Sequence, residues 1–184
     1  ADLLFVHHGF FWGHPLAIAG AHRSRIKALL DADIALYAVH LPLDMHEDLG
    51  NNAELARLLK LEGREPFGVY NGIKIGYRGN FPQPVDIQEA FERIAFKNRP
   101  ALALWPFGPE KSKNCAIISG GGGRELSQAI DAGVDLYITG EVNHEMYHSA
   151  LEAKINVICA GHYASEVWGL RSLMARVAEH CNVA

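Results

Sequence analysis

The sequence predicts an α/β fold with a largely parallel sheet and two related halves. Short apolar runs alternate with helical patterns along most of the chain, as in parallel sheets that are covered by helices. A pattern of strand, helix, strand and polar motif also occurs twice. The length of 184 residues suits one domain, or two small lobes that share a core.

Residues 1–64 are expected to form the first α/β lobe. The run Asp2-Leu-Leu-Phe-Val6 is typical of a buried strand. Because the chain begins directly in this strand and without Met, we expect an amino-terminal segment to be missing. The elements predicted here are strands at 2–7 and 33–40 and helices at 22–31 and 51–60.

Residues 65–110 are expected to form an insertion that contains a hairpin and a helix. Asn71-Gly72 lies between alternating apolar residues, which predicts a β-hairpin over 67–78. Proline and glycine predict loops around Phe81 to Pro84 and around Pro106 to Pro109. The remaining elements predicted here are a helix at 86–97 and a strand at 101–105.

Residues 111–184 are expected to form the second α/β lobe. Three apolar strands alternate here with three helical patterns. The strands are predicted at 115–119, 134–139 and 155–160, and the helices at 124–132, 143–153 and 163–180. Since an α/β protein usually adds another strand after the last helix, we expect a final strand to be missing.

The composition excludes several classes of protein. The chain carries 17 Lys and Arg against 21 Asp and Glu, a formal charge of −4, so nucleic acid is an improbable partner. No apolar run is long enough for a membrane span, which predicts a soluble protein. The 3 cysteines lack C-x-x-C spacing, so neither disulfides nor a zinc finger are indicated and a reducing, cytoplasmic location is expected.

An internal repeat places polar residues at corresponding positions. Residues 1–8 align with residues 134–141, strand with strand. After the second strand of each half comes a histidine and, four residues later, a carboxylate: His40 with Asp44, and His162 with Glu166. Both residues of the second pair lie 122 positions after their counterparts, 162 minus 40 and 166 minus 44. Common ancestry alone explains the strands, but not the shared polar motif.

These polar residues predict a dinuclear metal site. They follow the carboxyl ends of predicted parallel strands, where open α/β sheets bind ligands. Imidazoles and carboxylates suit zinc, iron, manganese or cobalt, and a carboxylate can bridge two such ions at about 3.5 to 4 Å. The adjacent residues His7 and His8 leave the strand in different directions, so each can serve a different ion. The predicted ligands are His7, His8, His40, Asp44, His162 and Glu166.

The two motifs differ in the local structure that we expect for them. The i, i+4 spacing puts His162 and Glu166 on one face of a helix, after a tight turn at Gly161. Pro42 makes the segment from His40 to Asp44 less regular, so there a turn is expected to bring the pair together.

Other residues near these motifs have less specific signals. Glu141 can either orient a metal-bound histidine or bind metal directly, and His148 can act as an acid or base from its helix. The glycine-rich run after strand 115–119 can offer backbone N–H groups to a phosphate, or can simply form a tight turn. Its candidate substrate-binding residues are Ser119, Gly120, Gly121 and Gly122. The remaining histidines are expected to be structural.

Taken together in this order, the motifs resemble those of the GTP cyclohydrolase 1 type 2 homologue family, the Nif-three-like dinuclear metal centre proteins, and especially its bacterial YbgI-type members. The resemblance covers essentially the whole chain. It implies two interlinked α/β lobes with related βαβ topology, a metal site between the lobes, and a ring-shaped homohexamer. The same six ligands follow from it residue by residue, with two divalent or trivalent transition-metal ions per chain.

Two functions remain open on this basis, and we favour the first. In one, two metal ions lower the pKa of a water, and the hydroxide attacks a nucleotide or a phosphoester, which makes the protein a metal-dependent hydrolase. In the other, the protein is a non-catalytic metal-binding or scaffold ring. A third interpretation, a ring that encircles DNA, is opposed by the net charge. Aromatic residues Phe10, Phe11 and Trp12 are expected to line a subunit contact or to cover the metal site.

Overall fold

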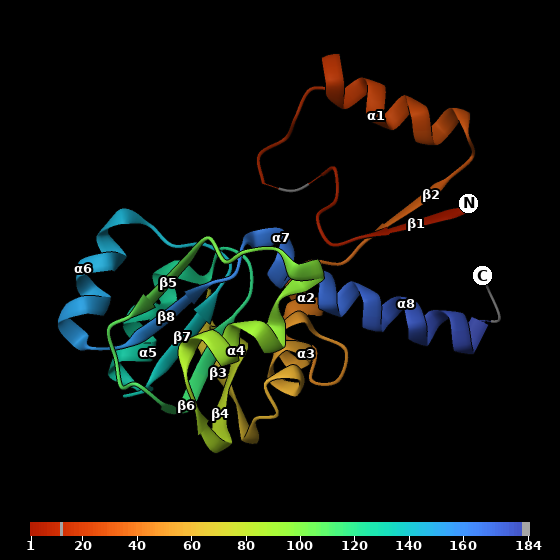
Figure 1. Ribbon diagram of the computed structural model, residues 1–184. Coiled ribbons are helices and arrows are strands. Elements are labelled where there is room, and N and C mark those ends of the chain that lie inside the picture. The colour runs from red at the N-terminus through yellow and green to blue at the C-terminus, as the bar shows by residue number, and fades with distance from the viewer. Residues whose placement is uncertain (12, 182–184) are drawn as a thin grey trace.

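The computed structural model describes residues 1–11 and 13–181, and it has an α/β fold built on two sheets (Figure 1). Trp12 lies outside the described residues. The smaller sheet pairs β1 (Leu3–Val6) in parallel with β2 (Ala35–Ala38), and helix α1 (Gly20–Asp31) connects the two strands. Among the described residues, no helix has both the length and the apolar character needed to cross a membrane.

The larger sheet has six strands in the order β3-β4-β6-β7-β8-β5. Strands β6, β7 and β8 are parallel neighbours, whereas the β3–β4, β4–β6 and β8–β5 pairs are antiparallel. The α/β class is therefore confirmed, with a mixed sheet. The strands are β3 (Glu62–Tyr70), β4 (Ile73–Val85), β5 (Ala103–Pro106), β6 (Ser112–Ile118), β7 (Leu136–Thr139) and β8 (Asn156–Cys159).

Helices pack on both faces of this sheet because its strands alternate apolar side chains between two hydrophobic clusters. On β6, for example, Ile117 belongs to the cluster under α3 and α4, and Ile118 to the cluster under α5 and α6. The helices are α2 (Leu41–Asp44), α3 (Asn51–Leu58), α4 (Ile87–Ile94), η1 (Phe96–Asn98), η2 (Gly122–Glu125), α5 (Leu126–Asp131), α6 (His144–Ala153), α7 (His162–Ser165) and α8 (Val167–Cys181).

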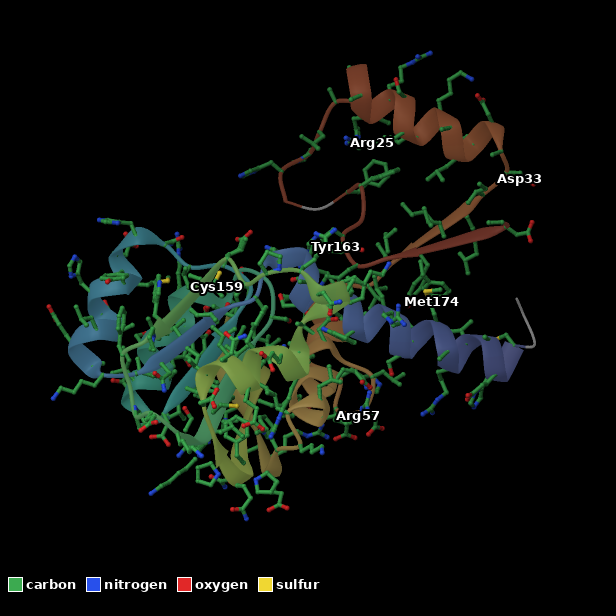
Figure 2. All side chains as sticks on the ribbon, in the orientation of Figure 1. Arg25, Asp33, Arg57, Cys159, Tyr163 and Met174 are labelled. Carbon is green, nitrogen blue, oxygen red and sulfur yellow. The ribbon has the colours of Figure 1, made fainter. Side chains whose placement is uncertain are left out.

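The unit formed by β1, α1 and β2 lies apart from the six-stranded sheet (Figure 1). In Figure 2, Arg25 and Asp33 of this unit are well separated from Cys159 in the larger sheet. Helix α8 passes beside the unit and contacts β1. The chain leaves β1 and β2 toward the larger sheet, so the residues that follow these strands reach the junction between the two parts.

The predicted strand positions are confirmed to within a few residues, and the Asn71-Gly72 hairpin joins β3 to β4 as expected. The loop predicted around Phe81 to Pro84 is wrong, because β4 continues to Val85. Its pairing with β6 shifts register between Asn80 and Val85, so the prolines occupy a stretch where regular ladder bonds are interrupted. Buried Phe81 and Val85 anchor this stretch in the core.

Three helical details also differ from expectation. The helix predicted at 163–180 is divided, because α7 ends at Ser165 and Glu166 leaves the helical conformation, with φ −111° and ψ 10°, before α8 begins at Val167. The helix predicted at 86–97 ends at Ile94, and the short helix η1 follows it with Lys97 in the left-handed region. The segment from His40 to Asp44 forms a single helical turn, since Pro42 falls in its first turn, where no backbone donor is needed. The division at residues 64 and 110 into two lobes and an insertion stays a prediction.

Candidate metal centre

The six predicted ligands converge at the junction of the two sheets. His7 and His8 follow β1, and His40 follows β2 directly before α2. Asp44 is the last residue of α2, while His162 opens α7 and Glu166 links α7 to α8 after β8. Each group comes from the carboxyl end of a strand, as the repeat predicts.

Ligand atoms from these six side chains form three overlapping groups, in each of which all atoms lie within 4.8 Å of one another. His8 and His7 each belong to two groups, and so does Glu166. Because the groups share members, the six residues form one continuous cluster and not separate sites. The groups are His7, His8 and His40; His8, His162 and Glu166; and His7, Asp44 and Glu166.

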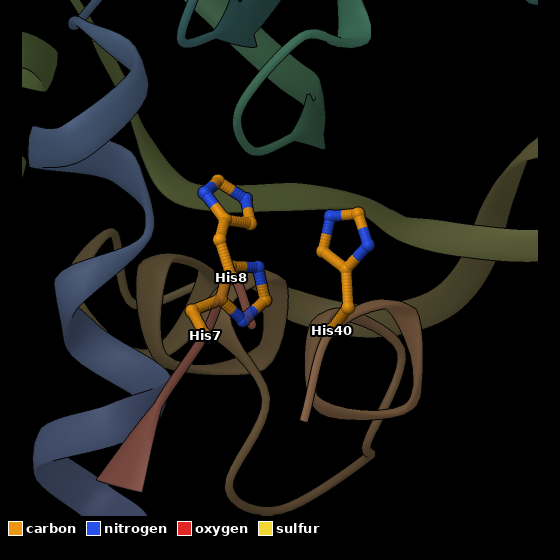
Figure 3. Close-up of side chains that lie close together, drawn as sticks. All are labelled: His7, His8 and His40. Carbon is orange, nitrogen blue, oxygen red and sulfur yellow. The ribbon is translucent and has the colours of Figure 1, made fainter. Parts of the chain in front are cut away.

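Four imidazole rings meet in this cluster. The rings of His7, His8 and His40 lie 4.8 to 5.0 Å apart between centroids, and Figure 3 shows the three gathered in one place. The ring of His162 lies 5.4 Å from that of His8. Imidazole nitrogens gathered this closely offer several lone pairs to a metal ion.

Glu166 faces both sides of the cluster with its two carboxylate oxygens. Oε1 lies 3.7 Å from Nε2 of His7. Oε2 lies 3.2 Å from Nε2 of His8 and 3.1 Å from Nε2 of His162. The carboxylate is buried, with its side chain 9% exposed, so its charge is little screened by water. This is the geometry in which one carboxylate can bridge two cations.

His7 is oriented by the backbone and by the second carboxylate. Its Nδ1–H donates to the carbonyl of Val39 at 2.9 Å, which directs Nε2 toward Asp44 Oδ2 at 3.2 Å. Burial lowers the pKa of His7, but Asp44 and Glu166 outweigh this effect and raise it to about 10. Without metal, this ring therefore holds a proton at neutral pH.

His8 is in the opposite electrostatic situation. Burial lowers its pKa, and the neighbouring imidazoles of His7, His40 and His162 lower it further, although Glu166 acts against them. His8 therefore presents a neutral ring at neutral pH. A neutral ring is the form that binds a metal ion.

Glu141 orients His162. Its Oε1 lies 3.0 Å from Nδ1 of His162, on the opposite side of the ring from Glu166. A carboxylate in this position fixes which ring nitrogen carries the proton and leaves Nε2 free to coordinate metal. Of the two roles considered for Glu141, the geometry supports orientation of the ligand.

Asp44 is held by hydrogen bonds that the sequence pattern does not predict. Its Oδ1 accepts hydrogen bonds from Asn51 Nδ2 at 2.9 Å and from Ser119 Oγ at 3.1 Å. Asn51 is fully buried, and its Oδ1 accepts from the backbone N–H of Gly169 in α8 at 2.7 Å. Oδ2 of Asp44 therefore remains directed at His7. The bonds of Ser119 to Asp44 and of Gly169 to Asn51 join segments distant in sequence, so no local motif predicts them.

The glycine-rich run passes beneath the cluster. Gly120 has a φ of +62°, and a Cβ there would lie 1.9 Å from Glu166 Oε1 and 3.1 Å from His162 Nε2. The N–H of Gly120 donates to Ser165 Oγ at 2.9 Å, so this N–H is not available to a phosphate. Gly120 thus provides the space that the ligand side chains occupy.

A cavity of about 360 Å³ opens beside the cluster. Five of the predicted ligands are among its lining residues: His8, His40, Asp44, His162 and Glu166. Of the predicted substrate-binding residues, the cavity is lined by Ser119, Gly121 and Gly122. The other lining residues, which sequence patterns do not identify, include Tyr70, Arg124 and Glu125.

Other predicted residues lie away from this cavity. His148 is exposed on α6 beside Tyr147, and it is not among the lining residues. Phe10 and Phe11 contact the ring of His22 instead of the metal cluster. The proposed roles of His148 and of the aromatic loop therefore stay predictions.

The donor set fits transition-metal ions. The Nε2 atoms of His7 and His162 are buried and make no hydrogen bond within the described part of the chain. Both nevertheless lie within 3.2 Å of a carboxylate oxygen. A neutral ring nitrogen and a carboxylate oxygen each offer a lone pair, so this approach requires a proton or a metal cation between them. Imidazole and carboxylate ligands in this number suit zinc, iron, manganese or cobalt.

Comparison with known proteins gives consistent matches along the whole chain. The family model for Duf34/NIF3 (NGG1p interacting factor 3) matches residues 1–184. A protein of Deinococcus radiodurans named GTP cyclohydrolase 1 type 2 homolog is 41% identical, over 100% of this chain and 70% of its own length. A protein of the same name from Pyrococcus horikoshii is 45% identical, over 100% of this chain and 73% of its own length.

The solved structure of protein ybgI, which is described as of unknown function, superposes with a TM-score of 0.85 at 39% identity. The superposition covers 98% of this chain and 72% of ybgI. The fold and the sequence therefore agree, and the chain belongs to the Duf34/NIF3 family.

Proposed function

We propose that the six-residue cluster holds two transition-metal ions, of iron, zinc, manganese or cobalt. The observation that carries this proposal is the position of Glu166, whose two oxygens face His7 on one side and His8 with His162 on the other. One carboxylate placed in this way suits a pair of ions better than a single ion. Asp44 and His40 complete the set near His7 and His8.

We further propose that the protein is a metal-dependent hydrolase that acts on a nucleotide or a phosphoester. Two bound ions of this kind lower the pKa of a water molecule and stabilise negative charge that develops during hydrolysis. The cavity beside the cluster has room for a small organic substrate next to the ligands. The name GTP cyclohydrolase 1 type 2 homolog, carried by the relatives, supports a nucleotide as substrate.

The chain's own residues supply orientation and proton transfer in this proposal. Glu141 holds the Nδ1 proton of His162 and can exchange protons with solvent, because its side chain is 55% exposed. Asn51 and Ser119 hold one oxygen of Asp44, so that its other oxygen stays directed at His7. His148 remains a candidate for proton transfer only if assembly or substrate brings it toward the cavity.

A homo-oligomer in the cytoplasm is part of the same proposal. The homohexamer is the assembly that the family resemblance of the sequence motifs implies. Exposed apolar side chains on the β1–α1–β2 unit, such as Leu4, Leu30 and Tyr37, offer surface for contacts between subunits. The three cysteines are all free, which suits a reducing compartment.

The proposal is tested by turnover with defined metal content. Protein stripped with a chelator is reloaded separately with iron, manganese, zinc or cobalt, and each form is incubated with purine nucleotides and simple phosphodiesters. We expect one metal form to hydrolyse at least one of these compounds, and chelator to abolish the activity. If every form binds two ions but none turns over any compound, the hydrolase proposal fails and a metal-binding scaffold is the better account.

A further inference from the structure

The cavity extends beyond the metal ligands to a wall that contains Glu125. This residue is buried, at 9% exposure, and lines the cavity from the short helix η2. Within residues 1–11 and 13–181, its carboxylate has no hydrogen-bond or ion-pair partner. The Tyr137 hydroxyl donates to the carbonyl of Gly122 instead. Burial and the negative charge of Glu125 both raise the pKa of Tyr137.

No protein group bonds the Glu125 carboxylate, and its oxygens are not among the fully enclosed side-chain atoms of the described residues, so they are open to the cavity. The carboxylate can only accept hydrogen bonds while it is ionised. A ligand that brings N–H donors into the cavity can therefore bond this carboxylate. Since Glu125 faces the same cavity as His8 and Glu166, this ligand lies next to the proposed metal centre.

Arg124 provides the opposite charge in the same cavity. It directly precedes Glu125, lines the cavity and is exposed. Its guanidinium forms no ion pair in the described part of the chain, and in particular none with Glu125. An unpaired guanidinium is suited to bind the oxygens of a phosphate. Tyr70, at the end of β3, adds an aromatic ring to the wall.

We propose that Glu125 and Arg124 determine the specificity of this cavity, and that they select a nucleotide whose base carries an exocyclic amine. Glu125 accepts hydrogen bonds from the amine, Arg124 pairs with the phosphate, and the ring of Tyr70 packs against the base. The inference rests on the proposed function in so far as a nucleotide is the ligand. It does not depend on turnover.

Binding of three nucleoside monophosphates to the metal-loaded protein tests this proposal by calorimetry. Adenosine and guanosine monophosphates carry the amine at different positions, and inosine monophosphate lacks it. We expect at least one of the first two to bind roughly tenfold or more tightly than inosine monophosphate, because a charge-assisted hydrogen bond is lost in the latter. Equal affinities for all three, within about twofold, would overturn the proposal without any variant.

Variants assign the preference to the two residues. Glu125→Gln is expected to reduce the preference for the amine-bearing monophosphate over inosine monophosphate to less than about threefold. The variant should keep its metal content and thermal midpoint, because it removes only a charge that has no partner in the protein. Arg124→Gln is expected to weaken the binding of all three monophosphates, but not the binding of the corresponding nucleosides. The matched controls are Glu152→Gln and Arg176→Gln, which change exposed residues away from the cavity.

The outcomes separate this proposal from the proposed function. A preference for the amine that Glu125→Gln leaves unchanged would contradict the role of Glu125, even in a protein with two ions and full turnover. Conversely, a preference that depends on Glu125 in a protein without hydrolytic activity would support the specificity site and count only against the hydrolase.

Discussion

At the scale of single residues, Gly120 and Gly133 form a natural pair for comparison. Both have positive φ values, of 62° and 64°, so alanine is strained by a similar amount at either position. A Cβ at Gly120 would overlap Glu166 Oε1, whereas a Cβ at Gly133 would meet nothing within 4 Å. The two substitutions therefore separate the effect of the backbone conformation from the effect on the ligand cluster.

We predict that Gly133→Ala lowers the free energy of unfolding by about 1 kcal/mol and leaves metal binding intact. Gly120→Ala should destabilise the protein further and lose at least half of its bound metal, because Glu166 must move. Elemental analysis and urea denaturation of both variants measure these effects. Full metal content in Gly120→Ala would show that the cluster does not need this space.

The proton on His7 gives a second prediction at this scale. The pKa of His7 in the metal-free protein is raised from 6.5 to about 10. Its stabilising contribution is complete below pH 6.5 and is lost as the pH rises through 10. The contribution of His7 to the thermal midpoint of the metal-free protein should therefore decrease as the pH is raised from 7 to 10. In the metal-loaded protein His7 is neutral and this contribution disappears.

Metal binding at about pH 8 should accordingly release a proton from His7. His8, whose pKa is lowered, should release none. Calorimetric titration with metal in buffers of different ionisation enthalpy measures the number of protons. The conservative variant His7→Gln, which cannot hold the proton, is the control, and proton release that is the same in both proteins would contradict the assignment.

At the scale of secondary-structure elements, the first turn of α3 connects the ligand segments. Asn51 bonds Asp44 at the end of α2 and the backbone of Gly169 in α8. Asn52 donates to the carbonyls of Asp44 and Ile75 and accepts from the N–H of Ser119 at 2.7 Å. Two buried amides thus fix α2, α8 and the end of β6 relative to one another.

We predict that Asn51→Ala lowers the free energy of unfolding by about 2 to 4 kcal/mol, since it leaves the buried Gly169 N–H without a partner and removes a donor from Asp44. Ser119→Ala removes only a donor to Asp44 and should cost about 1 kcal/mol. Chemical denaturation of metal-free protein measures both. Equal losses would mean that the bond to α8 contributes nothing.

The same elements show what the sequence could predict. The six candidate ligands were identifiable because they lie at or shortly after strand ends and two pairs of them repeat at a fixed spacing, so local pattern carries the information. Asn51 was not, because its role depends on a contact with a segment far away in the chain. The β4 extension to Val85 was missed because prolines normally end a strand, and only the interrupted ladder with β6 accommodates them.

Antiparallel pairing at the sheet edges was also beyond the sequence pattern. Strand β5 has the short apolar run expected of a parallel strand, yet it pairs antiparallel with β8. Its direction is set by the path of the chain through η1, where Lys97 and Asn98 adopt left-handed conformations. Lysine seldom adopts this conformation, and although asparagine adopts it more often, a single asparagine gives little signal in the sequence.

At the scale of the whole molecule, the ligand cluster connects two parts that share few other contacts. His7, His8 and His40 extend from the two-stranded sheet, and His162 and Glu166 belong to the segment that follows the larger sheet. None of the residues of helix α1 is buried, so this helix does not anchor the β1–α1–β2 unit to the rest of the protein. Bound metal should therefore link the unit to the rest of the protein.

We predict that metal raises the thermal midpoint and protects the β1–α1–β2 unit from hydrogen exchange. A ligand at about 100 times its dissociation constant stabilises by roughly 2.7 kcal/mol, which is several degrees for a protein of this size. Hydrogen exchange with and without chelator measures the effect on each segment. Protection that is unchanged in the unit but altered in α5 and α6 would place the metal elsewhere.

The central claim is that six side chains hold two metal ions per chain, and elemental analysis of gently purified, reloaded protein tests it most directly. We expect about two ions per chain, and the loss of at least one ion in His8→Ala and in Asp44→Ala. His144→Ala, which removes an exposed histidine outside the cluster, should retain both ions. Fewer than about 0.2 ions per chain in the unaltered protein, under conditions that should saturate a site of this donor set, would contradict the account.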